Sequence, residues 1–339
     1  MINVAINGFG RIGRMILRAG WNERKINFVA INDLTDTKTL AHLLKHDSLQ
    51  GSFKEEVGFT EDSLIISRKK IRVLAEKDPT KLPWKDLKVD LVIESTGRFT
   101  KPQDAAQHIL AGARRVLLSA PFKADGNILP PSTLTVLMGV NEHLYNPREH
   151  FIISNCSCTT NCIAPVLKVI SDNLGIKYCY FSTIHAYTAD QLLVDGPHKD
   201  LRRARAAAIN IIPTSSGADI AVEAVLPQLK GKVKGSAFRV PIACGSVTDF
   251  VIEVEKETSI EQVNQILRAS SINKMQGLLE YSENDLVSSD IIGNSYSTIV
   301  DSKLTRVLNN KIVKIVSWYD NEWGYSCRMV DIIKMIEEK

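Results

Sequence analysis

Three cysteines lie within residues 156–162, at the junction between a predicted strand and a predicted helix. Cys158 falls at the start of the helical pattern, where free backbone N–H groups and the helix dipole favour a thiolate. A thiolate is a strong nucleophile at neutral pH. Cys158 is therefore the candidate nucleophile.

Other interpretations of this cysteine cluster stay open. Free cysteines are often buried and inert, and Cys162, one helical turn after Cys158, is expected to have a packing role. Zinc is disfavoured, because no second Cys or His pair at finger spacing accompanies the cluster. Six cysteines in 339 residues are too few for a disulfide scaffold, which indicates free thiols in a reducing compartment.

His185 ends a predicted strand further along the chain, in the segment His-Ala-Tyr-Thr. A lone histidine is more often structural than catalytic. Beside a thiolate, however, an imidazole can act as a general base and hold the thiolate as an ion pair. His185 is therefore the candidate base.

An arginine run follows at Arg202, Arg203 and Arg205, and Arg239 comes later. Such a run is commonly a solvated face or a set of salt bridges. It could equally hold phosphate through charged hydrogen bonds, because hydroxyl groups and a glycine lie nearby at Thr214, Ser215, Ser216 and Gly217. Spacing alone does not separate the two interpretations.

A glycine pattern follows the first predicted strand and opens a helix, in Gly8-Phe9-Gly10-Arg11-Ile12-Gly13. In a dinucleotide-binding turn, these glycines allow a tight turn, close approach of a pyrophosphate, and helix–strand packing. The N–H groups at the helix start, around Arg11 and Ile12, would face the phosphates. Alone, the pattern also fits an ordinary tight turn.

Asp33 favours the dinucleotide interpretation, because it ends the next predicted strand, 20 residues after Gly13. A carboxylate there can accept hydrogen bonds from both ribose hydroxyls of NAD and would repel a 2′-phosphate. The alternative role is a helix N-cap for the segment that begins near Thr37. Together the glycines and Asp33 predict an NAD site.

These residues need a doubly wound parallel sheet to position them. In the N-terminal half, short apolar runs alternate with helical patterns, as in βαβ units. The predicted strands are Ile2–Ile6, Phe28–Ile31, Leu91–Ile93, Val116–Leu118 and Phe151–Ile153. The predicted helices are Ile12–Trp21, Thr37–Leu44 and Pro102–Ala111.

The pattern changes near residue 158, which predicts a second, α+β domain. A helix is expected from Cys158 to about Leu174, with apolar residues on one face. Longer strand-like runs favour a mostly antiparallel sheet, and they cover residues 176–185, 236–241, 246–255 and 311–318. The fold class is therefore α/β, a Rossmann-type cofactor domain followed by an α+β catalytic domain. A last amphipathic helix closes the chain.

Composition fits a globular protein of two domains in the cytoplasm. Hydrophobic residues make up 44% and charged residues 24% of the chain, which is ordinary for such proteins. No apolar run reaches the roughly 18 residues of a membrane span, and the first residues do not look like a signal peptide. The net charge of +4 is mostly spread along the chain, so no obligatory nucleic-acid partner is expected.

Five motifs together resemble one family. They are residues 7–14 (NGFGRIGR), 157–162 (SCTTNC), 185–190 (HAYTAD), 211–218 (IIPTSSGA) and 317–325 (SWYDNEWGY). The sequence resembles the phosphorylating glyceraldehyde-3-phosphate dehydrogenases, collinearly over essentially the whole chain. SCTTNC followed by HAYT is highly specific to them.

The resemblance implies a reaction and its residues. Cys158 would add to D-glyceraldehyde 3-phosphate with His185 as base, hydride would pass to NAD, and inorganic phosphate would release 1,3-bisphosphoglycerate. Thr188 and Arg239 match the site for the C3 phosphate of the substrate. The site for inorganic phosphate matches Ser157, Thr159, Ser216 and Gly217, with Arg203 nearby.

It also implies further cofactor contacts. Asn321 would hold the nicotinamide carboxamide, with Tyr325 beside it. The adenosine half of the cleft would be lined by Ser95, Thr96, Gly97 and Ser119.

The family is homotetrameric and has two domains. By resemblance, residues 1–157 form the NAD-binding domain, completed by the C-terminal helix 321–339, and residues 158–320 form the catalytic domain. A loop from about Thr188 to Ile211 would reach the cofactor of a neighbouring subunit.

The sequence departs from the family pattern in three places. Cys156 stands where the family usually has Ala, and Ser216 replaces a more usual Thr. Residues 242–245 (IACG) replace the usual Thr-Pro-Asn-Val. The nearest rival is erythrose-4-phosphate dehydrogenase, whose members typically lack HAYT. A non-catalytic binding protein on the same fold is disfavoured by the retained nucleophile, base and phosphate-binding residues.

Overall fold

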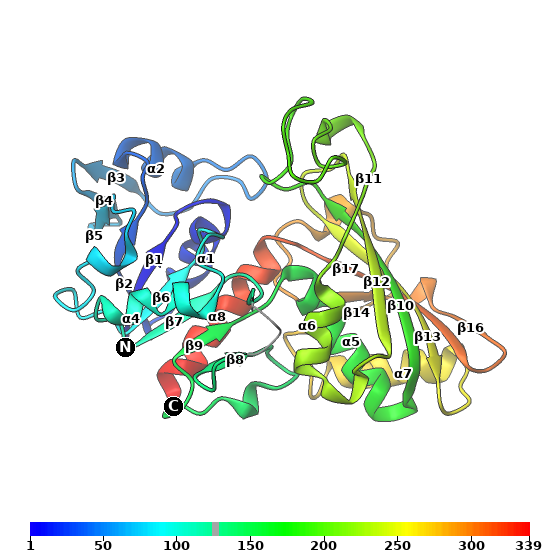
Figure 1. Ribbon diagram of the computed structural model, residues 1–339. Coiled ribbons are helices and arrows are strands. Elements are labelled where there is room, and N and C mark those ends of the chain that lie inside the picture. Colours follow the sequence, from blue (N-terminus) through cyan, green and yellow to red (C-terminus); the bar gives the residue numbers. More distant parts are fainter. Residues whose placement is uncertain (124–128) are drawn as a thin grey trace. The chain divides into compact units, whose positions relative to one another are not determined.

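The computed structural model describes residues 1–123 and 129–339, and the chain divides into two compact units. The first unit comprises Met1–Val136, Glu142–Cys156 and Ser326–Lys339. The second comprises Leu137–Asn141 and Ser157–Tyr325. Each unit is built around one β-sheet (Figure 1).

The first unit contains a nine-stranded sheet in the order β3-β4-β5-β2-β1-β6-β7-β9-β8. Its strands are β1 (Ile2–Asn7), β2 (Ile26–Asn32), β3 (Val57–Thr60), β4 (Ser63–Ile66), β5 (Lys69–Leu74), β6 (Leu91–Glu94), β7 (Arg115–Leu118), β8 (Thr133–Thr135) and β9 (Ile152–Ser154). From β5 onward in this order all neighbouring strands are parallel, which confirms the predicted Rossmann-type sheet. Because β2 and β6 flank β1 on opposite sides, the chain order reverses there, and ligands bind at such points beyond the carboxyl ends of the strands.

The helices of this unit follow the predicted places with one correction. They are α1 (Arg11–Gly20), α2 (Thr37–Lys45), α3 (Pro102–Ala105) and α4 (Gln107–Leu110). The single helix expected over 102–111 is divided into α3 and α4 at Ala106. There the N–H of Ile109 bonds back to Ala106 at 2.9 Å, three residues away rather than four, so the turn is tighter than an α-helix.

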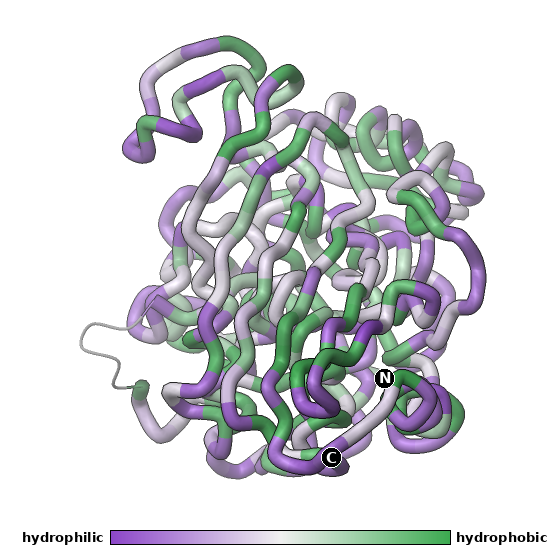
Figure 2. The backbone as a smooth tube through the Cα atoms, turned by 90° about the vertical axis from the view of Figure 1, so that its right-hand side faces the viewer, coloured by the Kyte–Doolittle hydropathy of each residue, from purple (hydrophilic) through white to green (hydrophobic). Residues whose placement is uncertain are grey.

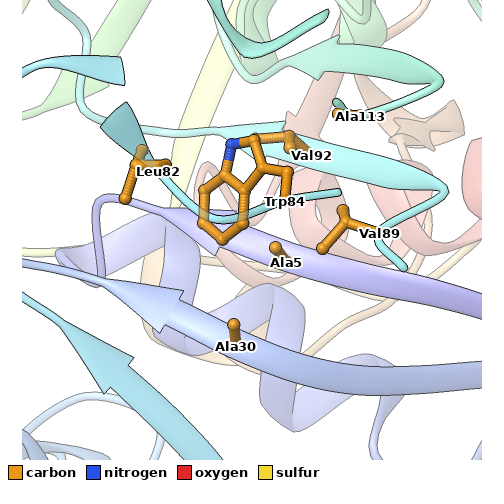
Figure 3. Packing of buried hydrophobic residues seen from close by; sticks show 7 residues of the cluster. All are labelled: Ala5, Ala30, Leu82, Trp84, Val89, Val92 and Ala113. Atoms are coloured by element: carbon orange, nitrogen blue, oxygen red, sulfur yellow. The ribbon is translucent and has the colours of Figure 1, made fainter. Parts of the chain in front are cut away.

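Trp84 forms the centre of one core cluster in the first unit (Figure 3). Its indole is fully buried and lies against Ala5 on β1, Ala30 on β2 and Val92 on β6. Two alanines on neighbouring strands leave the space that so large a ring needs. Loss of a buried Trp side chain typically costs about 3–5 kcal/mol.

The second unit contains a sheet in the order β11-β12-β10-β13-β17-β15-β14, with β16 paired to β17. Its strands are β10 (Ile176–Ala186), β11 (Ile212–Thr214), β12 (Val233–Val240), β13 (Ser246–Val254), β14 (Leu279–Ser282), β15 (Thr298–Asp301), β16 (Arg306–Leu308) and β17 (Ile312–Tyr319). Only the pairs β10–β12 and β14–β15 in the described residues are parallel. The predicted mostly antiparallel sheet is therefore confirmed.

Helices of the second unit are α5 (Cys158–Leu174), α6 (Ala218–Val225) and α7 (Ile260–Ser271), and α8 (Trp323–Glu338) ends the chain. Short 3₁₀ turns lie at Pro79–Lys81, Glu142–Leu144, Ala207–Ile209, Pro227–Leu229, Ser288–Ile291 and Ser302–Leu304. Helix α5 packs against β10, β13, β15 and β17, across the middle of the sheet. Along these strands hydrophilic and hydrophobic residues are interspersed, as Figure 2 shows, and Tyr178, Tyr180 and Val251 are exposed.

Candidate active site

The Cys158 thiol lies on the first residue of α5, a helix of 17 residues. Ser157, whose backbone is extended, is the N-cap of α5. Its Oγ accepts a hydrogen bond from the N–H of Thr160 at 3.1 Å. The helix dipole therefore favours negative charge at the sulfur. The pKa of the Cys158 thiol lies above its usual value, because burial raises it by more than the positive charge of Arg239 lowers it.

His185 lies next to this sulfur. Its Nε2 is 3.4 Å from Cys158 Sγ, although the two residues are 27 apart in sequence. The other ring nitrogen, Nδ1, is 2.6 Å from the carbonyl oxygen of Ala186. In the tautomer that donates Nδ1–H to this carbonyl, Nε2 is free to accept the thiol proton.

Arg239 approaches the imidazole from the neighbouring strand. Strands β10 and β12 pair in parallel with His185 opposite Arg239, and Arg239 Nη1 lies 2.6 Å from His185 Nδ1 and donates to Ala186 O at 2.9 Å. Because a guanidinium can only donate, Nδ1 accepts from Arg239 in one tautomer of His185. In the other, which leaves Nε2 as the base, Nδ1–H and Arg239 both donate to Ala186 O. Burial and the guanidinium charge lower the pKa of His185 to about 3. At neutral pH the imidazole is therefore uncharged, a proton acceptor rather than the cation of an ion pair.

Tyr319 is a residue of this site to which the sequence assigned no role. Its buried hydroxyl lies 3.1 Å from Thr159 Oγ1 and 2.9 Å from Thr183 Oγ1. Its ring meets the His185 ring edge-on at 5.9 Å. The signal was a tyrosine within the motif at 317–325, but nothing in the spacing indicated that β17 brings it to α5 and β10.

The two other cysteines of the cluster, Cys156 and Cys162, are poor nucleophiles. Cys162 is fully buried, 3.5 Å from Thr298 Oγ1, and burial raises the pKa of its thiol to about 12. Burial likewise raises the pKa of Cys156 to about 12; this residue occupies the left-handed region with φ +54°. All six cysteines are free thiols. No cluster of three or more metal-binding side chains occurs among the described residues.

The two arginines proposed to bind phosphate differ in their hydrogen bonding. Arg203 is in a salt bridge, with Nη1 2.7 Å from Asp190 Oδ2, and its Nε donates to Thr214 Oγ1 at 2.9 Å. Arg239, in contrast, has a buried Nε with no hydrogen-bond partner among the described residues, a donor that suits an anion.

The hydroxyl candidates lie at helix starts or in a loop. Ser216 accepts from the N–H of Ala218 at 3.2 Å, and Gly217 is the N-cap of α6. Ser157 and Thr159 lie at the start of α5, and Thr188 lies in the loop after β10, where its N–H donates to Gln191 Oε1 at 3.4 Å. Helix starts present free N–H groups to an anion.

A cavity of about 350 Å³ lies beyond the carboxyl ends of β1, β2 and β6 in the first unit. It brings together five of the predicted cofactor residues, namely Gly8, Gly10, Asp33, Ser95 and Thr96. It also includes residues to which the sequence assigned no role, namely Asn7, Asn32, Leu34, Glu76, Lys77, Arg98 and Phe99. Glu76 and Lys77 were missed because β5, which ends just before them, was not predicted.

The glycine turn fits a dinucleotide. Gly8 has φ +92°, and a Cβ there would lie 2.7 Å from the backbone nitrogen of Thr96, so only glycine allows this close approach. A Cβ at Gly10 would meet no described protein atom within 4 Å. The backbone at Gly10 is therefore open to a pyrophosphate.

Asp33 is joined to the same turn. Its Oδ2 accepts from the N–H of Phe9 at 2.8 Å and its Oδ1 from the N–H of Thr35 at 3.0 Å. The N-cap of α2 is Asp36, whose Oδ1 accepts from Thr39 N–H at 2.9 Å. The alternative role of Asp33 as the N-cap of α2 is therefore wrong.

Seven other predicted cofactor residues do not line this cavity, namely Arg11, Ile12, Gly13, Gly97, Ser119, Asn321 and Tyr325. Arg11 forms a two-point salt bridge with Asp47, one bond of which is 2.9 Å long. Asn321 and Tyr325 belong to the second unit.

Residues 242–245, where the sequence differs from the usual Thr-Pro-Asn-Val, include a hydrogen-bond donor to the side chain of Asn321. Asn321 Oδ1 accepts from the N–H of Gly245 at 3.2 Å and from Ser246 Oγ at 3.0 Å. Gly245 has φ +86°, and a Cβ there would overlap the carbonyl oxygen of Ser288. The changed segment thus still holds the Asn321 side chain.

Both units of the chain match known proteins of one family. Residues 2–102 match the family model of the glyceraldehyde 3-phosphate dehydrogenase NAD binding domain, and residues 157–321 match that of the C-terminal domain. A glyceraldehyde-3-phosphate dehydrogenase of Geobacillus stearothermophilus is 51% identical over 338 residues, which is 100% of this chain and 99% of the relative. One of Streptomyces coelicolor is 52% identical over 333 residues, covering 98% and 97%. The second such enzyme of Bacillus subtilis is 46% identical over 335 residues, covering 99% and 96%.

Proposed function

Because the chain belongs to the glyceraldehyde-3-phosphate dehydrogenase family, we propose that it oxidises D-glyceraldehyde 3-phosphate to 1,3-bisphosphoglycerate with NAD and inorganic phosphate. The observation that carries this function is the pairing of Cys158 Sγ with His185 Nε2 at 3.4 Å, at the start of α5. This pairing supplies a nucleophile and a proton acceptor in contact, as covalent aldehyde oxidation requires.

Acyl formation begins when His185 Nε2 takes the thiol proton and the sulfur bonds to the aldehyde carbon. His185 returns this proton to the aldehyde oxygen, which completes a thiohemiacetal on Cys158. Loss of the hydride from this carbon, for which NAD would be the acceptor, together with transfer of the hydroxyl proton back to His185 Nε2, would leave a thioester. The neutral state of His185 suits proton acceptance, and the Ala186 carbonyl fixes the ring by accepting Nδ1–H.

Release requires inorganic phosphate. A phosphate oxygen attacks the thioester carbon, the carbon–sulfur bond breaks, and the electron pair returns to Cys158 as thiolate. We place this phosphate between the starts of α5 and α6, at Ser157, Thr159, Ser216 and Gly217. Arg203 would join it on exchanging Asp190 for phosphate.

The C3 phosphate of the substrate is proposed to bind Thr188 and Arg239. Support comes from the Arg239 Nε, which is without a partner among the described residues. Burial and the Arg239 charge both lower the pKa of His185. An anion bound to Arg239 would offset the second of these effects, and so would strengthen the base when substrate is present.

The cofactor of this family is NAD, and the cavity of the first unit fits it. The Gly8–Gly13 turn, with Arg11 and Ile12, would face the pyrophosphate, and Asp33 the ribose of the adenosine. Ser95, Thr96, Gly97 and Ser119 would line the adenosine half. Asn321 and Tyr325 would hold the nicotinamide.

The proposed domains are 1–157 with 321–339 for the cofactor and 158–320 for catalysis. The division of the chain into two compact units supports them, with boundaries at Ser157 and Ser326. A cytoplasmic location is proposed because the nucleophile needs a reduced thiol. Every helix among the described residues is too short or too polar to cross a bilayer.

We also propose a homotetramer. The loop between β10 and β11 (Figure 1) exposes five large apolar side chains, namely Leu193, Val194, Leu201, Ile209 and Ile211. Side chains of this kind in one segment indicate an interface.

The direct test follows NADH absorbance with D-glyceraldehyde 3-phosphate, with and without inorganic phosphate. Turnover should need phosphate, and erythrose 4-phosphate should be used less well. Cys158→Ser should abolish turnover while NAD still binds, whereas Cys179→Ser, at another buried cysteine, should retain it. Turnover in Cys158→Ser, or a preference for erythrose 4-phosphate, would contradict the proposal.

A further inference from the structure

A chain of hydrogen-bonded side chains runs from the core of the first unit to the wall of the dinucleotide cavity. Its inner end is the indole of Trp84, in the cluster shown in Figure 3. From there it passes through His108 on α4, Glu94 at the end of β6, Asn7 at the end of β1 and Asn32 at the end of β2. All five residues are at least 95% buried.

The first two bonds determine which histidine nitrogen carries the proton. Trp84 Nε1 lies 3.1 Å from His108 Nδ1, and an indole N–H can only donate. Nδ1 is therefore the acceptor, and the ring proton resides on Nε2. From Nε2 it is donated to Glu94 Oε2, at 3.0 Å.

Glu94 receives donors on both of its oxygens. Oε2 also accepts from Asn7 Nδ2 at 2.6 Å, and Oε1 accepts from the N–H of Thr96 at 2.9 Å and from its hydroxyl at 2.5 Å. Three of the four contacts are N–H groups that can only donate here. Both side-chain oxygens of Glu94 must therefore act as acceptors, which requires the deprotonated carboxylate.

The chain then reaches the cavity. Asn7 Oδ1 accepts from Asn32 Nδ2 at 2.7 Å, and Asn32 Oδ1 accepts from the N–H of Glu76 at 2.9 Å. Asn7, Asn32, Glu76 and Thr96 line the cavity, whereas Glu94, His108 and Trp84 do not. Thr96 also packs so closely on Gly8 that a shift of Thr96 would disturb the glycine turn.

We propose that Glu94 is a positioning residue for NAD, held in place by His108 and Trp84. Its carboxylate orients the amide of Asn7 and the backbone of Thr96 from behind, so that strand ends β1, β2 and β6 present one fixed wall to the dinucleotide. Because NAD binding belongs to the proposed function, this role depends on it. Glu94 would set cofactor affinity without taking part in chemistry at Cys158.

The test exchanges carboxylate and amide within the chain. In Glu94→Gln either orientation of the amide points an N–H at a donor, so the Kd for NAD, measured by calorimetry on the full-length protein, should rise about tenfold. Asn7→Asp would place two carboxylates at the same contact and should weaken NAD binding at least as much. In the double variant the new carboxylate at position 7 accepts from the new amide at position 94. It also accepts from His108, whose Nε2 lies 3.3 Å from the Asn7 nitrogen, and the Kd should return to within about threefold.

Two readouts separate positioning from stability alone. With saturating NAD, kcat of Glu94→Gln should stay within about threefold, because only binding is affected. Trp84→Phe should weaken NAD binding, whereas Trp21→Phe, at a partly buried tryptophan of the same unit that lies outside this hydrogen-bond chain, should not. An unchanged Kd in Glu94→Gln, or no recovery in the double variant when it melts like the unsubstituted protein, overturns the proposal.

Failure of the proposed function would look different. If the unsubstituted protein binds NAD but forms no NADH from the aldehyde, the activity is wrong, and the Kd changes still decide the role of Glu94.

Discussion

The Cys158 thiol is subject to opposing effects at the scale of single residues. Burial raises the pKa of this thiol, whereas the charge of Arg239 lowers it. The α5 N-terminus acts in the same direction as Arg239. The reactivity of the Cys158 thiol therefore depends on Arg239 and on the start of α5, neither of which forms a bond to the reacting carbon.

Removal of the Arg239 charge should make Cys158 less reactive. In Arg239→Leu the thiol pKa should rise, so the pH profile of iodoacetamide labelling should shift upward and labelling at neutral pH should slow. Peptide mapping of Cys158 across pH measures this. Arg205→Leu, which removes an exposed ion pair with Asp195, is the control and should leave the profile unchanged. An unshifted profile in Arg239→Leu would mean that this charge does not act on the thiol.

Loss of the His185 imidazole should slow turnover. Asn in its place cannot accept the thiol proton, so kcat should fall by about 10²-fold or more. Steady-state NADH formation measures it, with His198→Asn as the matched control because His198 contacts Asp190 and not Cys158. A decrease of less than about threefold would rule out a role for His185 as base.

At the scale of elements, strand pairing places the catalytic residues. The parallel register of β10 and β12 sets His185 beside Arg239, and β13 and β17 extend the same sheet to Tyr319. The segment that joins β12 to β13 then turns at Gly245, whose N–H binds Asn321. A one-residue slip in any of these strands would separate the site residues.

A side chain at Gly245 should disturb this segment. Gly245→Ala would combine positive φ with a Cβ that overlaps a backbone oxygen. We expect unfolding to become easier by about 2–4 kcal/mol, from strain and displaced backbone, and NAD binding to weaken as Asn321 shifts. Gly231→Ala is the control, because Gly231 has φ +74° but no described atom within 4 Å of its Cβ position. Equal melting temperatures for the two variants would show that a Cβ at position 245 does not clash with the backbone of Ser288.

At the scale of the whole molecule, the exposed side chains of the chain determine how its subunits assemble. The loop between β10 and β11 exposes large apolar side chains that a subunit interface would bury. Apolar side chains left in water contribute nothing to stability, and burial of each against a partner is worth roughly 1.5–3 kcal/mol. Assembly should therefore depend on this loop.

A charge placed in the loop should weaken the tetramer. Sedimentation of the unsubstituted protein should give about four times the chain mass of 37.7 kDa. Leu201→Asp should shift the distribution to smaller species, because an aspartate resists burial. Leu110→Asp is the control, since Leu110 is 79% exposed in the first unit and Leu201 is 82% exposed. A monomer in the unsubstituted protein, or equal effects of both substitutions, would argue against this interface.

Local patterns in the sequence alone determined the parts of the site that lie within one short segment. Cys158 at a helix start, the glycine turn at Gly8 and Asp33 after β2 each depend on residues a few positions apart. The principal helices and the central strands were predictable for the same reason, because their hydrophobic period shows on one element. The strands β3 to β5 were missed, since each is short and the chain reverses at Ser67 and Arg68 with positive φ.

Tertiary structure decided every contact between distant segments. His185 meets Arg239 across two paired strands, Tyr319 reaches both Thr159 and Thr183, and Trp84 determines the tautomer of His108. Such contacts depend on register and on chain reversal, and neither leaves a period in the sequence. The neutral state of His185 follows from burial and from Arg239, so it too depends on the folded sheet.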